Sequence, residues 1–317
     1  MISSILLGIG IFVLLALAVA PLDALGWWSR KGADEAAELV TELREPVVPP
    51  TDFDHYVVYL SGIGAIDGRS VPEEEEPLIA AIAAIPGTCL IRDVFPYSVE
   101  NKSLTGQRPL AWLWKRIEKL RFAKPESLAG MLINARNSAQ LFVSADRRYG
   151  PTYNIGTARE VFEALHRNGY PFGTGKPVTL VGFSGGAQIS IGAASYLGLG
   201  DVIPVRVVSI GGMMSDDPGL NRVEQVWHLR GTKDIFEKLG GVMFAGRWPH
   251  AVFSPWSDAL AEGRITIYDL GPMNHNGKAH YFDPNTFAAE DGRSYLQITI
   301  DAVVAVLTDQ PVHTVTR

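Results

Sequence analysis

The sequence predicts an α/β protein in which a mostly parallel β-sheet is covered by helices on both faces. Short apolar runs rich in β-branched residues alternate along the chain with helical patterns. These runs are apolar throughout rather than at every second position, as expected for strands buried on both faces. The chain has 317 residues, of which 47% are hydrophobic and 20% charged, so it can bury a sizeable core.

The N-terminal segment 1–28 is predicted to be a transmembrane anchor. From the second residue to Ala20 it is uncharged and nearly all apolar, and about 20 such residues in a helix cross a hydrocarbon core of ~30 Å. Trp27 and Trp28 follow at interface height, and Arg30 and Lys31 come next. The positive-inside rule then predicts a single-pass membrane protein with its globular body in the cytoplasm.

A cleaved signal peptide is the alternative interpretation of this segment. Residues 18–20 have the small-x-small form of a cleavage site. However, no basic region precedes the apolar run, and Pro21 would follow the cut. These features favour a retained anchor.

The rest of the chain is predicted to form a stalk and one globular domain. Residues 29–50 have the pattern of a juxtamembrane helix followed by the stiff proline-rich stalk "EPVVPP". The domain spans 51–317 and contains a helical insertion at about 97–176, before the apolar strand pattern of 178–183. The strands are expected at 55–60, 88–95, 178–183, 203–212, 223–231 and 264–270, and the main helices at 71–87, 187–198 and 294–307.

The net charge and the cysteine content of the chain limit the binding partners and the covalent links that it can have. The net charge of −6 gives no global basic field, so a nucleic-acid partner is not expected. Cys89 is the single cysteine, which excludes an intrachain disulfide, and its apolar surroundings predict a buried, inert thiol. No spacing of His, Cys and carboxylates suggests a metal site, and no cofactor is expected.

The four glutamates 73–76 are interpreted as a solvated helix start that complements the helix dipole.

Two glycine-rich turns do not fit phosphate-binding motifs. In "GYPFGTGKPV", Pro177 stands where a P-loop needs Ser or Thr, and Tyr170 stands where the first glycine belongs. In "SGIGAIDG" the glycines are one residue out of register for a dinucleotide fingerprint, and the glutamates that follow would repel a phosphate. A nucleotide site is therefore not predicted.

A third glycine-rich turn, "GFSGG" at 182–186, has the G-x-S-x-G pattern of a nucleophile elbow. An apolar strand precedes it and a small-residue helix follows. In such a turn the serine side chain projects above the sheet, and the glycines avoid collisions with the adjacent strand and helix. A tight packing turn with an inert Ser184 is the alternative.

On these residues the segment from Thr51 to about Leu307 resembles the α/β-hydrolase superfamily. In that family the nucleophile, the acid and the histidine occur in this order, each after its own strand. Asp234 follows the strand of 223–231 in a G-x-x-D turn, and His275 follows the last strand in "GPMNH". The resemblance implies that Ser184 is the nucleophile, that His275 is the general base, and that Asp234 orients the imidazole.

The resemblance leaves two assignments open. His280 is an alternative base, although the short loop before His275 favours His275. Asp216 is an alternative acid, although Asp-Asp-Pro-Gly is simpler to explain as a turn. His228, within a strand pattern, is interpreted as a core or edge residue.

The resemblance also implies an oxyanion hole of two backbone N–H groups. One belongs to Gly185, which follows the nucleophile, and the other to the loop after the first strand, "SGIGA". Ile63 is the expected second donor, with Gly62 as the alternative one residue earlier.

The predicted function is that of a membrane-anchored serine hydrolase that cleaves a carboxylic ester or thioester, with a small-molecule or lipid acyl group. A basic, tryptophan-containing helix within the insertion is a candidate for contact with an anionic membrane. The segment 240–256 is apolar enough to line an acyl pocket. Acyl transfer or amide hydrolysis by the same residues, and a non-catalytic binding protein, remain alternatives; the sequence gives no indication of oligomeric state.

Overall fold

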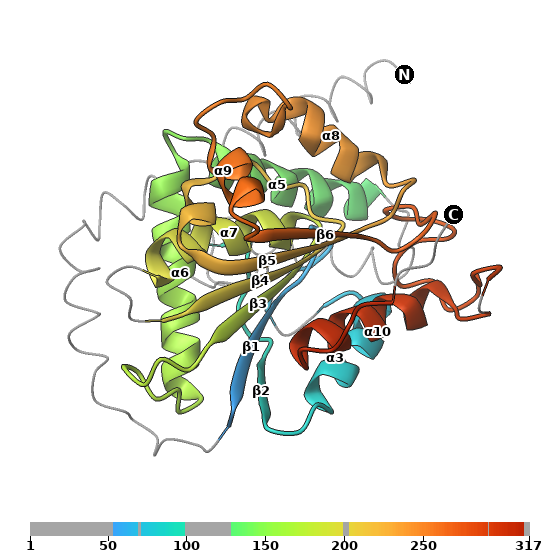
Figure 1. Cartoon of the computed structure of the whole chain (residues 1–317), viewed down its shortest axis with the longest axis horizontal. Coiled ribbons are helices and arrows are strands. Elements are labelled where there is room, and N and C mark those ends of the chain that lie inside the picture. The colour runs from blue at the N-terminus through green and yellow to red at the C-terminus, as the bar shows by residue number, and fades with distance from the viewer. Residues whose placement is uncertain (1–52, 69–70, 99–127, 199–202, 291, 314–317) are drawn as a thin grey trace.

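A computed structural model of the chain describes residues 53–68, 71–98, 128–198, 203–290 and 292–313 (Figure 1). The predicted anchor, the stalk and the basic tryptophan-containing helix lie outside these residues. Within the described ranges, no helix is both long and apolar enough to cross a bilayer.

Six parallel strands form one sheet in the order β2-β1-β3-β4-β5-β6. The prediction of an α/β protein with a parallel sheet is thus confirmed. The elements, in chain order, are β1 (His55–Leu60), η1 (Glu73–Glu75), α3 (Glu76–Ala83), β2 (Thr88–Ile91), α5 (Leu128–Ala145), α6 (Gly150–Arg167), β3 (Val178–Phe183), α7 (Gly185–Leu197), β4 (Val205–Ile210), η3 (Pro218–Asn221), β5 (Val223–Arg230), α8 (Ile235–Met243), η4 (Ala245–Arg247), α9 (Pro255–Ala261), β6 (Ile265–Asp269) and α10 (Tyr295–Leu307).

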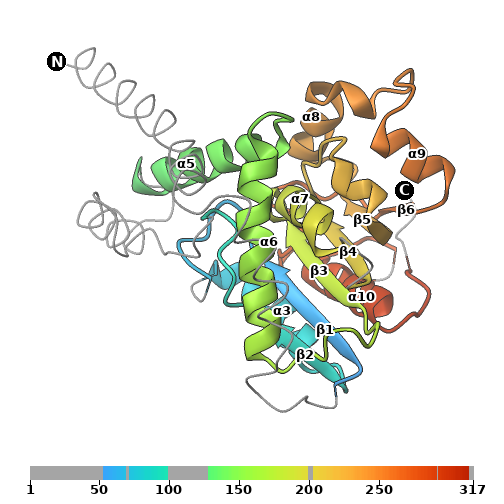
Figure 2. The ribbon, with the colours of Figure 1, turned by 90° about the vertical axis from the view of Figure 1, so that its left-hand side faces the viewer.

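Helices cover both faces of the sheet, as Figures 1 and 2 show. Successive side chains of a strand point to opposite faces. Tyr56 and Val58 of β1 therefore join the core formed with α6 and α7, whereas Val57 and Tyr59 join the core formed with α3 and α10. Burial on both faces explains why the strands lack polar alternation.

The strand expected at 88–95 is shorter than predicted, because β2 ends at Ile91. β2 is at the edge of the sheet and pairs only with β1, through a register that ends at Val58 and Ile91. Val94 and Phe95 are nevertheless buried, because the chain leaves the sheet and packs its apolar side chains in the loop that follows. Because buried loop residues are as apolar as strand residues, the sequence pattern did not show where β2 ends.

Parallel pairing places the carboxyl ends of all six strands at one edge of the sheet. The loops that leave β1 at Leu60, β3 at Phe183, β5 at Arg230 and β6 at Asp269 all start from this edge. Residues far apart in the chain therefore come together there, which is the usual place for a site in an open α/β sheet.

Candidate active site

A continuous line of hydrogen bonds joins Ser184, His275 and Asp234. Ser184 Oγ lies 2.7 Å from His275 Nε2, and His275 Nδ1 lies 2.8 Å from Asp234 Oδ2. The three residues come from the turns after β3, β6 and β5, as the order of motifs predicted. Ser184 and His275 are 91 positions apart in the chain, and His275 and Asp234 are 41 positions apart. The sheet therefore brings the three residues together.

Ser184 occupies a strained turn between β3 and α7. Its φ of 53° and ψ of −118° place a non-glycine residue in a region that side chains disfavour. Its N–H donates to the Ile210 carbonyl of β4 at 2.9 Å, which fixes the turn. A Cβ on Gly182 would lie 2.5 Å from the Ala187 nitrogen, and one on Gly186 would lie 2.1 Å from the Leu60 oxygen. Both glycines are therefore sterically required.

Asp234 accepts hydrogen bonds on both carboxylate oxygens. Oδ1 accepts from the backbone N–H groups of Phe236, at 2.9 Å, and Glu237, at 3.0 Å, which cap α8. Oδ2 accepts from Tyr281 Oη at 2.7 Å in addition to His275. Because Asp234 is fully buried, these donors replace the water that an exposed carboxylate would bind.

The Tyr281 hydroxyl is a positioning group that the sequence did not identify. It accepts from the Gly231 N–H at 2.7 Å and donates to Asp234. Burial, followed by the negative charge of Asp234, raises the pKa of Tyr281 well above its ordinary value, so the hydroxyl keeps the proton that it donates.

Aromatic rings on two sides hold the His275 ring. Phe183, the residue before Ser184, stacks on the imidazole with ring centroids 5.4 Å apart and planes 16° apart. The ring of Phe236 in α8 lies 4.9 Å away on centroids, tilted by 46°. His275 therefore keeps the orientation in which its two nitrogens face Ser184 and Asp234.

The amide of Gly62, one of the two donors considered in the loop after β1, is engaged by Glu75. Gly62 N–H points to Glu75 Oε1 at 3.4 Å. The Ile63 side chain lies next to Gly185, where an added Cβ would be 3.0 Å from Ile63 Cγ2. The Ile63 carbonyl accepts from Asn137 Nδ2 at 2.7 Å, which holds the loop from behind. Gly185 is the first residue of α7, and the first amides of a helix have no intrahelical acceptor.

Glu75 is buried beneath this loop, contrary to the expectation of a solvated helix start. It is 1% exposed, whereas Glu73 and Glu74 are exposed. Tyr59 Oη donates to its Oε2 at 2.8 Å. Burial raises the pKa of Glu75 from 4.5 to about 7, although the hydrogen bonds that it accepts act in the opposite direction.

Helical spacing was the signal that would have found Glu75. It lies three, four and seven positions before the buried residues Leu78, Ile79 and Ile82, and therefore on the same helix face. In the sequence this position was hidden within a run of four identical charges. A single carboxyl group on the apolar face of a helix is therefore a stronger indication of a special environment than a run of four glutamates is.

We expect Glu75 to make the protein more stable at low pH. The folded state keeps a proton that the unfolded state releases between about pH 4.5 and 7, so this contribution is complete below 4.5 and is lost as the pH rises through 7. Glu75→Gln should remove about 3 kcal/mol of this dependence, read from urea unfolding across the pH range. Glu74→Gln is the exposed control, and identical pH curves for Glu75→Gln and the wild type would contradict the expectation.

The alternative residues lie in other contacts. His280 Nδ1 accepts from the Phe282 N–H at 3.4 Å, and no contact joins it to Ser184 in the described structure. Asp216 pairs with Arg147 at 2.6 Å. His228 is fully buried, as expected for a core residue. The structure thus brings His275 and Asp234, rather than His280 and Asp216, to the serine.

Cys89 is free and buried, as expected. In the part of the chain that the structure describes, no three side chains of His, Cys, Asp or Glu converge as metal ligands do.

Comparison of the chain with models of known protein families and with curated protein sequences finds no match.

Proposed function

We propose that the protein is a serine hydrolase with an α/β-hydrolase fold that cleaves a carboxylic ester or thioester. The observation that carries the proposal is the unbroken line from Ser184 Oγ through His275 to the buried Asp234. The strained turn of Ser184 and the strand after which each residue occurs support the same assignment.

In the first half-reaction Ser184 Oγ attacks the acyl carbonyl carbon and transfers its proton to His275 Nε2. Asp234 holds the opposite nitrogen and stabilises the imidazolium. The carbonyl oxygen becomes an oxyanion, which the Gly185 and Ile63 N–H groups receive. His275 then returns the proton to the leaving alcohol or thiol, and the acyl group stays on Ser184.

In the second half-reaction water takes the place of the alcohol. His275 Nε2 accepts a proton from the water as its oxygen attacks the acyl carbon. The tetrahedral intermediate collapses, the acid leaves, and His275 returns the proton to Ser184 Oγ. The protein is unchanged after one ester and one water have become an acid and an alcohol.

A hydrophobic acyl group is the proposed substrate feature. A Cβ on Gly185 would lie 2.8 Å from Leu141 Cδ1, 2.9 Å from Tyr97 Oη and 3.0 Å from Ile63 Cγ2, so two apolar side chains and one hydroxyl lie beside the residue that follows the nucleophile. Phe236 lies on the other side, against His275. Together with the predicted anchor at 1–28, these residues favour a lipid or another acyl substrate presented near a membrane.

Labelling with a fluorophosphonate probe tests the proposal. We expect the full-length chain to be labelled at Ser184, because the probe reacts only with a serine that a base has activated. Ser184→Ala should lose the label entirely. Ser190→Ala is the matched control, because Ser190 lies in the same turn-helix unit but donates only to the Gly186 carbonyl, at 2.8 Å. Equal labelling of Ser184→Ala, or none of the wild type, would exclude a serine hydrolase.

A further inference from the structure

Helix α8 has its polarity reversed relative to an ordinary surface helix. Its apolar side chains recur at positions i, i+1, i+4, i+7 and i+8, which lie on one helix face. All five point outward and are 41 to 74% exposed, namely Ile235, Phe236, Leu239, Val242 and Met243. The carboxylate of the helix, Glu237, is buried instead.

Internal contacts hold α8 in this orientation. Glu237 Oε1 lies 2.8 Å from Arg247 Nη2 and 3.1 Å from His228 Nε2, and the side chains of all three are almost completely buried. The Arg247 guanidinium lies 4.1 Å above the Trp256 ring centroid. Asp234 caps the start of the helix. The apolar face is therefore held outward by the fold.

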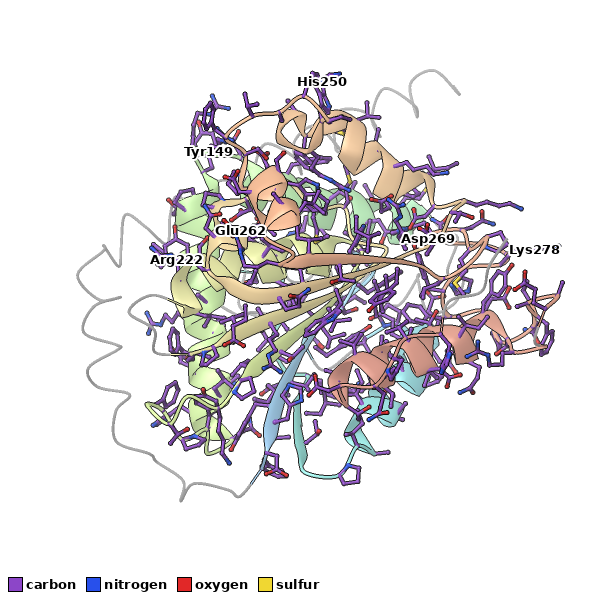
Figure 3. The ribbon with its side chains drawn as sticks, in the orientation of Figure 1. Tyr149, Arg222, His250, Glu262, Asp269 and Lys278 are labelled. Carbon is purple, nitrogen blue, oxygen red and sulfur yellow. The ribbon has the colours of Figure 1, made fainter. Side chains whose placement is uncertain are left out.

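The loop after α8 extends the same surface. Val252 is 76% exposed and Phe253 94% exposed, at the tip between η4 and α9. Phe253 has a φ of 61°, a strained conformation for an aromatic residue. Figure 3 labels His250 at this outer end of the molecule. A phenyl ring that is almost fully exposed adds little to the folded core, and together with Val252 it forms an exposed apolar tip.

The exposed charges of this surface are basic. Between Gly231 and Ser257 the carboxylates are Asp234 and Glu237, and both are buried. Lys233, Lys238 and His250 are exposed. Asp216, beside Gly246, is mostly buried and paired with Arg147. Asp258, in the first turn of α9, is the exposed carboxylate that follows this stretch. An apolar surface bordered mainly by lysines matches the interface of a membrane that contains anionic lipids.

We propose that the outward face of α8 and the 252–253 tip form a docking surface that inserts into a phospholipid bilayer. This docking surface adjoins the candidate site, because Asp234 caps α8 and Phe236 contacts the His275 ring. Docking would place the mouth of the site at the lipid headgroups. That consequence rests on the proposed function, whereas the membrane contact does not.

The test uses the full-length chain in vesicles of phosphatidylcholine with and without phosphatidylglycerol. A polarity-sensitive fluorophore is attached at Val252→Cys; Cys89 is buried, so the engineered thiol is the reactive one. Thr174→Cys is the matched control, because Thr174 is an exposed loop residue just before β3, at the opposite edge of the sheet. We expect a blue shift and quenching by quencher-bearing lipid at position 252 and neither at position 174, with stronger quenching when phosphatidylglycerol is present.

Two further variants separate docking from catalysis. Phe253→Ser, added to the labelled Val252→Cys variant, should lower the ratio of docked to undocked protein about tenfold. Its turnover of a water-soluble ester should be unchanged. Adding Ser184→Ala should abolish turnover and leave the quenching intact. Emission typical of water at position 252 would overturn the proposal. So would a blue shift without lipid quenching, because another protein segment or a second copy would then cover the surface.

Discussion

His275→Ala is expected to lower kcat for a carboxylic ester by about 10⁴-fold or more, because the serine loses its general base. His280→Ala, in the same loop, should stay within about threefold of the wild type, because His280 contacts backbone near Phe282 rather than Ser184. Steady-state turnover of a chromogenic ester by the full-length chain measures both.

The same pair of variants can contradict the assignment. If His280→Ala alone is inactive, the base is His280 and the loop must rearrange when substrate binds. If both variants retain activity, the hydrogen bond between His275 and Ser184 has no catalytic role. Fluorophosphonate labelling of each variant gives a second readout, since His275→Ala should label much more slowly than His280→Ala.

Asp234→Asn is expected to lower kcat by about 10⁴-fold with little change in KM. An amide at this position can donate to Nδ1, which favours the tautomer whose Nε2 carries a proton and cannot accept one from Ser184. Asp216→Asn is the matched control, because Asp216 is the alternative acid and pairs with Arg147. The ester assay used for the histidine variants measures both effects.

A stability measurement must accompany Asp234→Asn, because Asp234 also caps α8. An asparagine side chain caps helices nearly as well as aspartate, so any fall in the melting temperature should come from the Tyr281 hydroxyl, which loses its acceptor. A loss of activity at an unchanged melting temperature supports the catalytic assignment. Activity lost in Asp216→Asn and retained in Asp234→Asn would identify Asp216 as the acid.

The sequence was sufficient for the order of the strands and of the candidate site residues, although not for the end of β2. Buried parallel strands are continuous apolar runs, so β1 and β3 were predicted with the bounds that they have. The positions of Asp234 and His275 after later strands followed from the same pattern. These are the features that local composition determines.

Features that depend on tertiary packing were not predictable. Nothing in "SGIGA" shows that the Gly62 amide is engaged, because this contact depends on where the buried Glu75 carboxyl lies. The exposure of α8 was not predicted either; of its outward residues, Val242 and Met243 fall in the segment 240–256, which the sequence indicates as the lining of an acyl pocket. An apolar helix face is the same in sequence whether it faces inward or outward; only the burial of Glu237 distinguishes the two.

The four hydrogen bonds that Asp234 accepts have a consequence for substrate access. Two come from the first turn of α8, and a third orients His275. A movement that lifted α8 away as a lid would remove both amide donors and release the carboxylate that holds the base. The helix is therefore a fixed wall of the candidate site, and a substrate of the proposed hydrolase would have to reach Ser184 without a movement of α8.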